Sequence, residues 1–435
     1  MTNKVKGLIK FIWDTSTEIF AKKRIVNNIS ILYGAHIISK IVSFFSFTFL
    51  AKYLGSENFG IISFAFAYTG IIVVIIDMGI NPLITREIAR DKSKTEEYMN
   101  NIFTFRIFLS LLIFFFFTLF VFGQNYSLLK KEVILLIGIS AILNVLFNNF
   151  VAIFQGFNYF FYQAIVQVFT SAGMFIGVML VMKFKFSIIW CASLYVLFSI
   201  ISFSYSLIIY LSKISPIQMK INIRFLKKIF NTGLPFFLSS IILSFFPRID
   251  VILLSHITGA DTHAGWFNAS WKINETLIFV PSLYMTVIYP TLSELSIVSR
   301  NELEKIIKTS FKYLFGISSI LSFLIFIYSK PIILLLYNTE YTPSISILKI
   351  IIWQLIFISL NFLYGGVLAA INKQIFTFLS AFVILFFNIL LDFLLIPKYN
   401  HIGASLSSTL SQCLLCLFLY FWIKKFLREM NECKK

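Results

Sequence analysis

The stretches FFPRIDVILLSHITG, residues 245–259, and GWFNASWKINETLIFVPSLYM, residues 265–285, place charged side chains inside two neighbouring apolar segments. The segments run from about 229 to 255 and from about 264 to 290, and each is long enough to cross a bilayer as a helix. Their charged residues are Arg248, Asp250, Lys272 and Glu275. An ionised side chain at the middle of a membrane helix costs about 2.5–3.5 kcal/mol on insertion scales. We therefore expect these side chains to face the interior of a protein rather than lipid.

Two interpretations of these four charges are open. In the first, they form internal ion pairs that lock two helices together. In the second, they line a hydrated, net-basic site for an anionic solute inside the membrane. Lys272 and Glu275 are three residues apart and share a helix face, whereas Arg248 and Asp250 are two apart and cannot both point the same way. Because the first segment leads outward and the second returns, Arg248 and Lys272 fall at similar depth and can sit across one shared cavity.

The composition of the chain is that of a polytopic membrane protein. Of its 435 residues, 58% are hydrophobic and only 13% are charged, which lies outside the range of soluble proteins. Apolar runs of about 20–25 residues suit membrane helices and are too long for barrel strands. A net charge of +18 would indicate nucleic acid for a soluble chain, but in a membrane protein it orients the spans, so we expect no nucleic-acid partner. The predicted fold class is all-α.

The apolar segments predict two lobes of six membrane helices each. A basic amphipathic segment, residues 1–27, is expected to lie at the membrane surface, followed by an N-lobe over 28–215 and a C-lobe over 216–435. Of the 37 Lys and Arg residues, 25 then fall on the side of the termini and seven on the other, which predicts cytoplasmic termini. The twelve predicted spans are 28–53, 58–80, 100–122, 132–155, 158–182, 187–210, 229–255, 264–290, 306–329, 345–370, 374–396 and 401–423.

The two lobes resemble each other in sequence. LGSENFGIISFA follows the first span and TGADTHAGWFNA follows the seventh, so that Gly55 matches Gly259 and Gly60 matches Gly265 after a one-residue insertion. Six spans is an even number, and two such copies insert in the same orientation. Transporters built from repeats of this kind bind substrate between the halves and rock them for alternating access.

Other polar side chains also fall within predicted spans. Lys40 is far from water, and we expect either a cavity cation or a structural pairing. His36 shares its face and is either a hydrogen-bonded neutral histidine or a proton relay. Asp77 and Arg106 are expected to form a salt bridge that pins two helices rather than to contact a substrate. Asp392 is either a coupling carboxylate or the partner of an Asn or Ser.

Motifs for catalysis are missing from the sequence. There is no GxxxxGK[ST] motif for ATP hydrolysis and no His, Cys, Asp or Glu cluster with metal-ligand spacing. The loops are too short to carry a catalytic site. We therefore expect a transporter without cofactor, metal or catalytic residues.

Four motifs follow one another along the chain: AKYLGSENFGIISFA, DMGINPLITREIAR, PRIDVILL and GWFNASWKINE. Through these motifs, and from about residue 28 to 425, the chain resembles the O-antigen (Wzx-type) flippases of the multidrug/oligosaccharidyl-lipid/polysaccharide exporter superfamily. The resemblance implies a V-shaped pair of six-helix lobes in a bacterial inner membrane. It also implies that an oligosaccharide linked to undecaprenyl pyrophosphate, an O-antigen or capsule repeat unit, is flipped from the cytoplasmic to the outer leaflet. Membrane lipids, a polysaccharide polymerase and a chain-length regulator are the implied partners.

A lipid-linked sugar presents a diphosphate and a hydroxylated head, which need cations, amides and aromatic rings. The predicted contacts to the pyrophosphate and the sugars are Lys40, Arg248, Lys272, Asn268, Trp271 and Asn274. Helix packing or interfacial anchoring is the alternative role of the tryptophan. Asp250 or Glu275 is expected to couple transport to a proton gradient, a sodium gradient or the membrane potential.

Two other functions are weighed against the flippase. A drug or cation antiporter of the same superfamily would want a cavity dominated by carboxylates, whereas three cations and two carboxylates are predicted here. A membrane-embedded polysaccharide polymerase would need a long outer loop with catalytic arginines, and the predicted outer loops are short.

Overall fold

The computed structural model describes the backbone of residues 2–432, and side chains from residue 32 onward except 33, 231–236, 238–244, 246–247 and 430–432. The regular structure in these residues is helical and contains no strand, so the predicted all-α fold class is confirmed. The amphipathic character predicted for residues 1–27 depends on side chains that lie outside this description. The main helices are α1 (Thr2–Asp77), α2 (Asn81–Arg90), α3 (Thr95–Tyr98), α4 (Thr104–Gly123), α5 (Leu128–Gly156), α6 (Phe160–Phe184), α7 (Ile188–Lys213), α8 (Ile223–Thr258), α9 (Asp261–Leu277), α10 (Phe279–Val298), α11 (Arg300–Leu336), α12 (Ser344–Ile351), α13 (Gln354–Ala370), α14 (Gln374–Tyr399) and α15 (His401–Glu432).

The first two predicted spans both lie in α1, on either side of one non-helical residue. Gly55 has φ 75° and ψ 172°, outside the helical region, so α1 is two helices joined at a sharp break. A side chain at positive φ clashes with the backbone, and glycine adopts this conformation without that cost. The break folds the segment before Gly55 back against residues 56–77.

Ten helices in the described part of the chain are long and apolar enough to cross a membrane. The chain is therefore a multi-pass membrane protein. One of the ten, Gly34–Arg90, contains the break at Gly55, and α8 is described only in part. The count of twelve spans stays a prediction.

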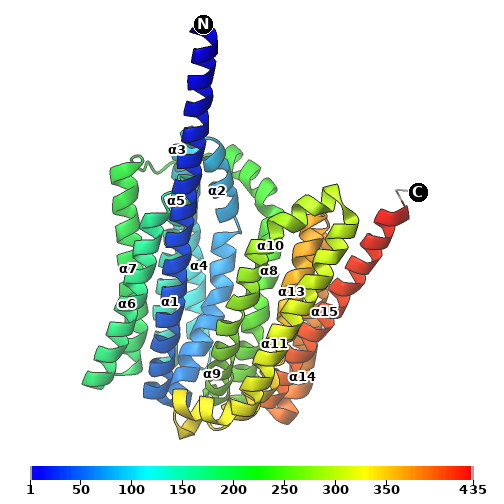
Figure 1. Cartoon of the computed structure of the whole chain (residues 1–435). Helices are drawn as coiled ribbons and strands as arrows, with labels where there is room; N and C mark the ends of the chain where they lie inside the picture. Colours follow the sequence, from blue (N-terminus) through cyan, green and yellow to red (C-terminus); the bar gives the residue numbers. More distant parts are fainter. Residues whose placement is uncertain (1, 433–435) are drawn as a thin grey trace.

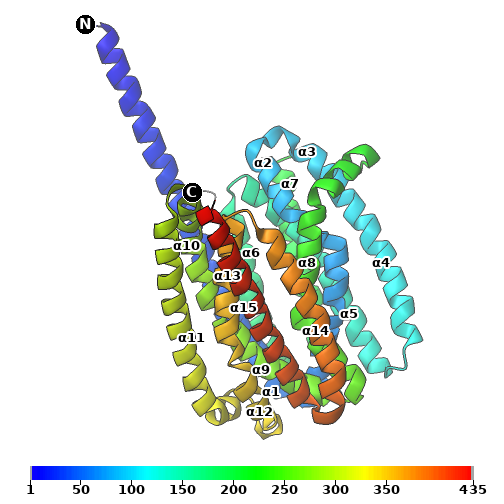
Figure 2. The ribbon, with the colours of Figure 1, turned by 90° about the vertical axis from the view of Figure 1, so that its right-hand side faces the viewer.

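The helices form two bundles that lie side by side (Figure 1). In the first, α1 packs against α5 and α6, and α7 packs against both of these. In the second, α15 packs against α13 and α14. Helix α8 contacts α14, and both α10 and α11 contact α13. The bundles meet where α1 contacts α8 and α9. Both ends of the chain lie at one end of the molecule, and the α8–α9 turn and α12 lie at the other (Figures 1 and 2).

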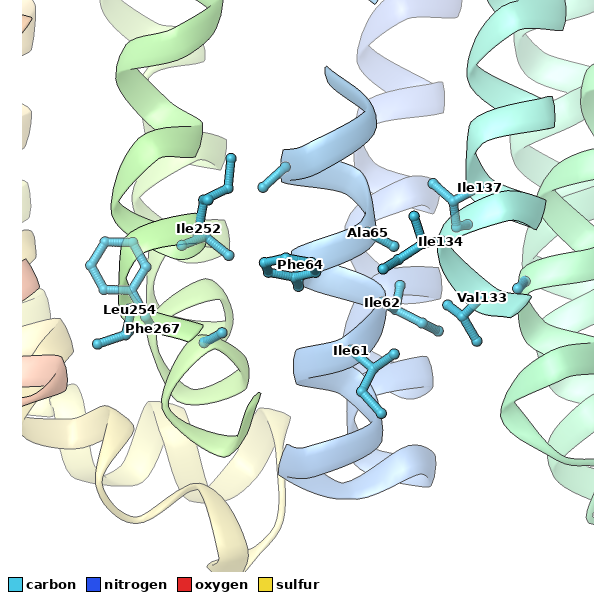
Figure 3. Packing of buried hydrophobic residues seen from close by; sticks show 14 of the residues in the cluster. Ile61, Ile62, Phe64, Ala65, Val133, Ile134, Ile137, Ile252, Leu254 and Phe267 are labelled. Carbon is cyan, nitrogen blue, oxygen red and sulfur yellow. The ribbon is translucent and has the colours of Figure 1, made fainter. Parts of the chain in front are cut away.

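A buried apolar cluster holds the two bundles together. Phe64 on the second part of α1 lies between Ile134 of α5 and Ile252 of α8 (Figure 3). Phe267 of α9 belongs to the same cluster. The part of α1 that follows Gly55 is therefore the shared wall of both bundles, and it positions the site described next.

Candidate functional site

A cavity of about 400 Å³ lies between the two bundles. A hollow of about 200 Å³ adjoins it and shares Ser43, Lys272 and Glu275 with it, so the two make up one central cavity. The first bundle contributes both parts of α1, α6 and α7, and the second contributes α8 and α9. The side chains that line the central cavity are Ser39, Lys40, Ser43, Ser46, Phe47, Ser63, Phe66, Ala67, Gln167, Ser171, Met174, Tyr195, Arg248, Val251, Asn268, Trp271, Lys272, Glu275 and Thr276.

Three cations and one carboxylate line the central cavity, which is therefore net basic. Lys40 comes from the first bundle, and Arg248 and Lys272 come from the second. The carboxylate is Glu275, whose Oε2 lies 2.9 Å from Lys272 Nζ. Lys272 Nζ also lies 4.9 Å from the centre of the Phe47 ring, a cation–π contact across the two bundles. A single carboxylate does not neutralise three cations, so an anion is favoured in this space.

Arg248 lies directly against the backbone of α1 at Gly70. A Cβ atom added at Gly70 would come within 2.1 Å of Arg248 Nε and 2.5 Å of its Cδ. Any larger residue at position 70 would therefore push the guanidinium group out of its place. The sequence gives no sign of this dependence, because the two residues are far apart in the chain.

One face of α9 is turned to the central cavity. Asn268, Trp271, Lys272 and Glu275 lie within an arc of about 100° when successive residues are placed about 100° apart around the helix. Asn274 was expected beside them but is fully buried and does not line the cavity. It lies about 120° away from Asn268 on this projection, on a face that packs against other helices.

The surroundings of Lys40 add an amide that was not predicted. Gln167 and Ser171 of α6 line the hollow next to Lys40. Gln167 Nε2 lies 2.7 Å from His36 Nδ1, so His36 contacts the cavity through this amide rather than directly. A polar Gln inside the predicted span 158–182 was a signal that could have identified this position.

Asp250 points away from the central cavity and meets a second carboxyl group. It is buried next to Asp392 and Asn388 of α14 and Ser408 of α15, and its Oδ1 has no hydrogen-bond partner among the described residues. Ser407 Oγ donates to Asp392 Oδ1 at 2.6 Å. Arg248 and Asp250 leave α8 in different directions, as their spacing predicts, so the count of two carboxylates in the cavity is wrong and only Glu275 lines it.

Asp77 and Arg106 form the predicted ion pair, and it lies outside the central cavity. Arg106 Nη2 is 3.2 Å from Asp77 Oδ1 and donates to the Asp77 carbonyl oxygen at 2.6 Å. Arg106 Nη1 donates to Asn81 and Asn149 at 2.8 and 2.9 Å. This buried network ties α1, α2, α4 and α5 together.

The bundles are closed against each other at the end opposite the termini. Glu340 Oε1 accepts hydrogen bonds from Ser56 N and Ser56 Oγ at 2.7 and 2.6 Å, directly after the break in α1. Lys130 Nζ lies 2.6 Å from Asp261 Oδ1, with both side chains largely buried. These contacts join the two bundles at that end.

The glycines matched by the internal repeat meet at this closed end. A Cβ at Gly60 would come within 1.8 Å of the Asp261 carbonyl oxygen, and one at Gly265 within 2.1 Å of the Ser56 carbonyl oxygen. The matched Gly55 and Gly259 both have positive φ, 75° and 67°. In each repeat, the first glycine therefore allows the chain to turn, and the second allows a close contact between two backbones.

Two family models match the sequence. A model described as "Polysaccharide biosynthesis protein" matches residues 25–296, and one described as "MatE" matches residues 235–394. The first covers more than half of the chain and includes every residue of the central cavity.

Two curated relatives are similar to the chain. It is 27% identical over 413 residues to the "Capsular polysaccharide biosynthesis protein CapF" of Staphylococcus aureus, with 92% of this chain and 99% of that protein covered. It is 24% identical over 204 residues to the "Probable low-salt glycan biosynthesis flippase Agl15" of Haloferax volcanii, with 46% of this chain and 43% of that protein covered.

Two solved structures have a similar fold. One is an inward-facing multidrug resistance MATE family transporter of the MOP superfamily, with a TM-score of 0.74 and 15% identity over 90% of this chain and 96% of that one. The other is the lipid II flippase MurJ in an inward closed conformation, with a TM-score of 0.74 and 17% identity over 90% of this chain and 87% of that one.

Proposed function

We propose that this chain, which belongs to the polysaccharide biosynthesis protein family, flips a lipid-linked oligosaccharide across the membrane. The proposed substrate is an O-antigen or capsule repeat unit on undecaprenyl pyrophosphate, moved from the cytoplasmic to the outer leaflet. The observation that carries the proposal is the net-basic central cavity between the two bundles, closed at one end. A cavity with one closed end is one of the two states that alternating access requires.

The chemistry of the central cavity suits a sugar diphosphate. Arg248 can offer two parallel N–H donors to a phosphate, while Lys272 and Lys40 act as point charges. Asn268 and Gln167 offer amide groups to sugar hydroxyls, and Trp271 offers a ring on which a sugar can stack. The polyprenyl tail would remain in the bilayer while the headgroup crosses inside the protein.

The buried carboxyl pair is our candidate for the coupling site. Two carboxylates in contact repel each other, so Asp250 and Asp392 need to share a proton or a cation to remain buried together. Asn388 and Ser407 supply further oxygen and nitrogen partners at the same place. We propose that a proton or Na⁺ bound here drives the cycle, whereas Glu275 pairs with Lys272.

A cation or drug antiporter is the second candidate, because the MatE model matches residues 235–394. Its substrate would have to enter a space lined by Lys40, Arg248 and Lys272 with only Glu275 as counter-charge. Electrostatics favours the anionic substrate. A polymerase is a weaker alternative, and we expect no enzymatic activity.

The location and partners follow from the same premise. A bacterial plasma membrane with both termini in the cytoplasm agrees with the excess of Lys and Arg predicted on the side of the termini. A polysaccharide polymerase and a chain-length regulator would act on the flipped product.

The proposal is tested by deleting the gene and restoring it with charge variants. A strain without the protein should accumulate lipid-linked glycan on the cytoplasmic face. Arg248→Ala and Lys272→Ala should fail to restore surface polysaccharide, while Lys349→Ala should restore it, because Lys349 lies in a candidate span outside the cavity. Normal polysaccharide in the deletion strain would refute the function, and full restoration by the two cavity variants would refute the site.

A further inference from the structure

A second large hollow lies on the second bundle, outside the central cavity. This groove has a volume of about 800 Å³ and is lined by residues of α11, α13 and α15. α11 and α15 both pack against α13, and Figure 2 shows these three helices. Part of its lining is apolar and includes Leu360 of α13, Phe311 and Phe315 of α11 and Leu417 of α15. The last three are exposed.

The end of the groove nearest the chain termini is strongly basic. Five cations line the groove, and they are spread over about 18 Å along α11 and about 6 Å along α15. Glu304 is the one carboxylate among the lining residues, and its Oε1 lies 2.6 Å from Arg300 Nη2. The other four cations form no salt bridge with any residue that the structure describes. The five cations are Arg300, Lys308, Lys312, Lys424 and Arg428.

One donor at this end is buried without an acceptor. Arg300 is only 11% exposed, and its Nη1 has no hydrogen-bond partner although it lies out of reach of solvent. A buried N–H group left unpaired is unfavourable, and for a charged group the cost is larger. Arg300 therefore keeps one donor that Glu304 does not satisfy, beside the groove that it lines.

We propose that this groove binds an anionic membrane phospholipid. The phosphodiester headgroup lies among the five cations, and the acyl chains follow the apolar part of the groove. The apolar lining between Cys413 and Tyr420 covers about 11 Å along α15, about three quarters of the roughly 15 Å depth of one hydrocarbon leaflet. A zwitterionic headgroup would bring its own cation into a basic region, so the charge of the groove selects for a net negative lipid.

Binding to the full-length protein can be measured without any transport assay. The purified, delipidated chain is titrated with dioleoyl phosphatidylglycerol or dioleoyl phosphatidylcholine, and bound lipid is counted by native mass spectrometry. We compare Lys308→Gln/Lys424→Gln with the matched control Lys305→Gln/Lys425→Gln, which removes two exposed lysines from the same helices outside the groove. The groove variant should lose roughly 25-fold in affinity for phosphatidylglycerol, about fivefold per cation, and the control should change less than threefold.

Three results would overturn this assignment. Equal binding of phosphatidylcholine would show an apolar groove without headgroup selection, and an equal loss in the control would show a general effect of charge. Tighter binding of a polyprenyl phosphate, lost in the same groove variant, would assign the groove to the lipid of the transport substrate instead. None of these outcomes depends on whether the central cavity carries a lipid-linked sugar.

Discussion

Replacing Gly70 by alanine should impair transport by moving Arg248 while leaving the fold intact. The new Cβ would lie 2.1 Å from Arg248 Nε, whereas an unstrained contact needs about 3.5 Å. The guanidinium group must therefore shift by more than 1 Å and lose its place in the central cavity. A hydrogen bond to a charged group contributes about 1.5–3 kcal/mol, so we expect a loss of roughly 10- to 150-fold in substrate affinity.

The same substitution should not destabilise the protein. Alanine stabilises a helix interior by about 0.5–1 kcal/mol relative to glycine. This gain offsets the cost of moving the Arg248 side chain. Transport of a lipid-linked oligosaccharide into proteoliposomes and the thermal melting temperature are measured together. Gly316→Ala is the matched control, because a Cβ there has nothing within 4 Å. In a double-mutant cycle, Gly70→Ala should add nothing to Arg248→Ala. Wild-type transport by Gly70→Ala, or a further loss in the double variant, would refute the reasoning.

Three further predictions concern other parts of the molecule. Gly265→Ala should force the bundles apart at the closed end, because its Cβ would meet the Ser56 carbonyl oxygen at 2.1 Å. The rate at which a thiol reagent added on that side labels a Ser63→Cys variant should then increase, and an unchanged rate would contradict this. Arg106→Ala should lower the free energy of unfolding by about 3 kcal/mol, because it leaves Asp77 without its partner, and a melting temperature equal to that of the wild type would rule this out. Asp392→Asn should make transport insensitive to the coupling gradient, measured by dissipating proton and sodium gradients in turn, and an unaltered response would remove the coupling proposal.

Much of the architecture could be predicted from the apolar pattern. Long uncharged runs must be helices in a membrane, because backbone groups have no other partners there. The pattern placed Lys40, Arg248 and Lys272 within spans, and the structure places all three around one cavity. The pattern also divided the first two spans at residues 54–57, and the structure breaks α1 there, at Gly55. It did not show the form of this break, since a glycine in a sequence does not reveal its φ angle.

The remaining errors have two different causes. Asn274 could have been excluded from the cavity by its angular position on the helix, because the cavity face was already fixed by Lys272 and Glu275. The partner of Asp250 could not have been found, because Asp392 lies on another helix and a contact between distant segments has no local signature. Gly70 was missed for the same reason, since its importance comes only from the side chain of Arg248.

The contact between Glu340 and Ser56 affects how easily the two bundles can separate at the closed end. Both hydrogen bonds join an acceptor on one bundle to donors on the other, at a place where the helix backbone is already interrupted. When the bundles separate, water can replace each partner at once, so the net cost of opening is that of exchanging similar hydrogen bonds. This contact can exchange protein partners for water, and back again, in every transport cycle without unfolding any helix.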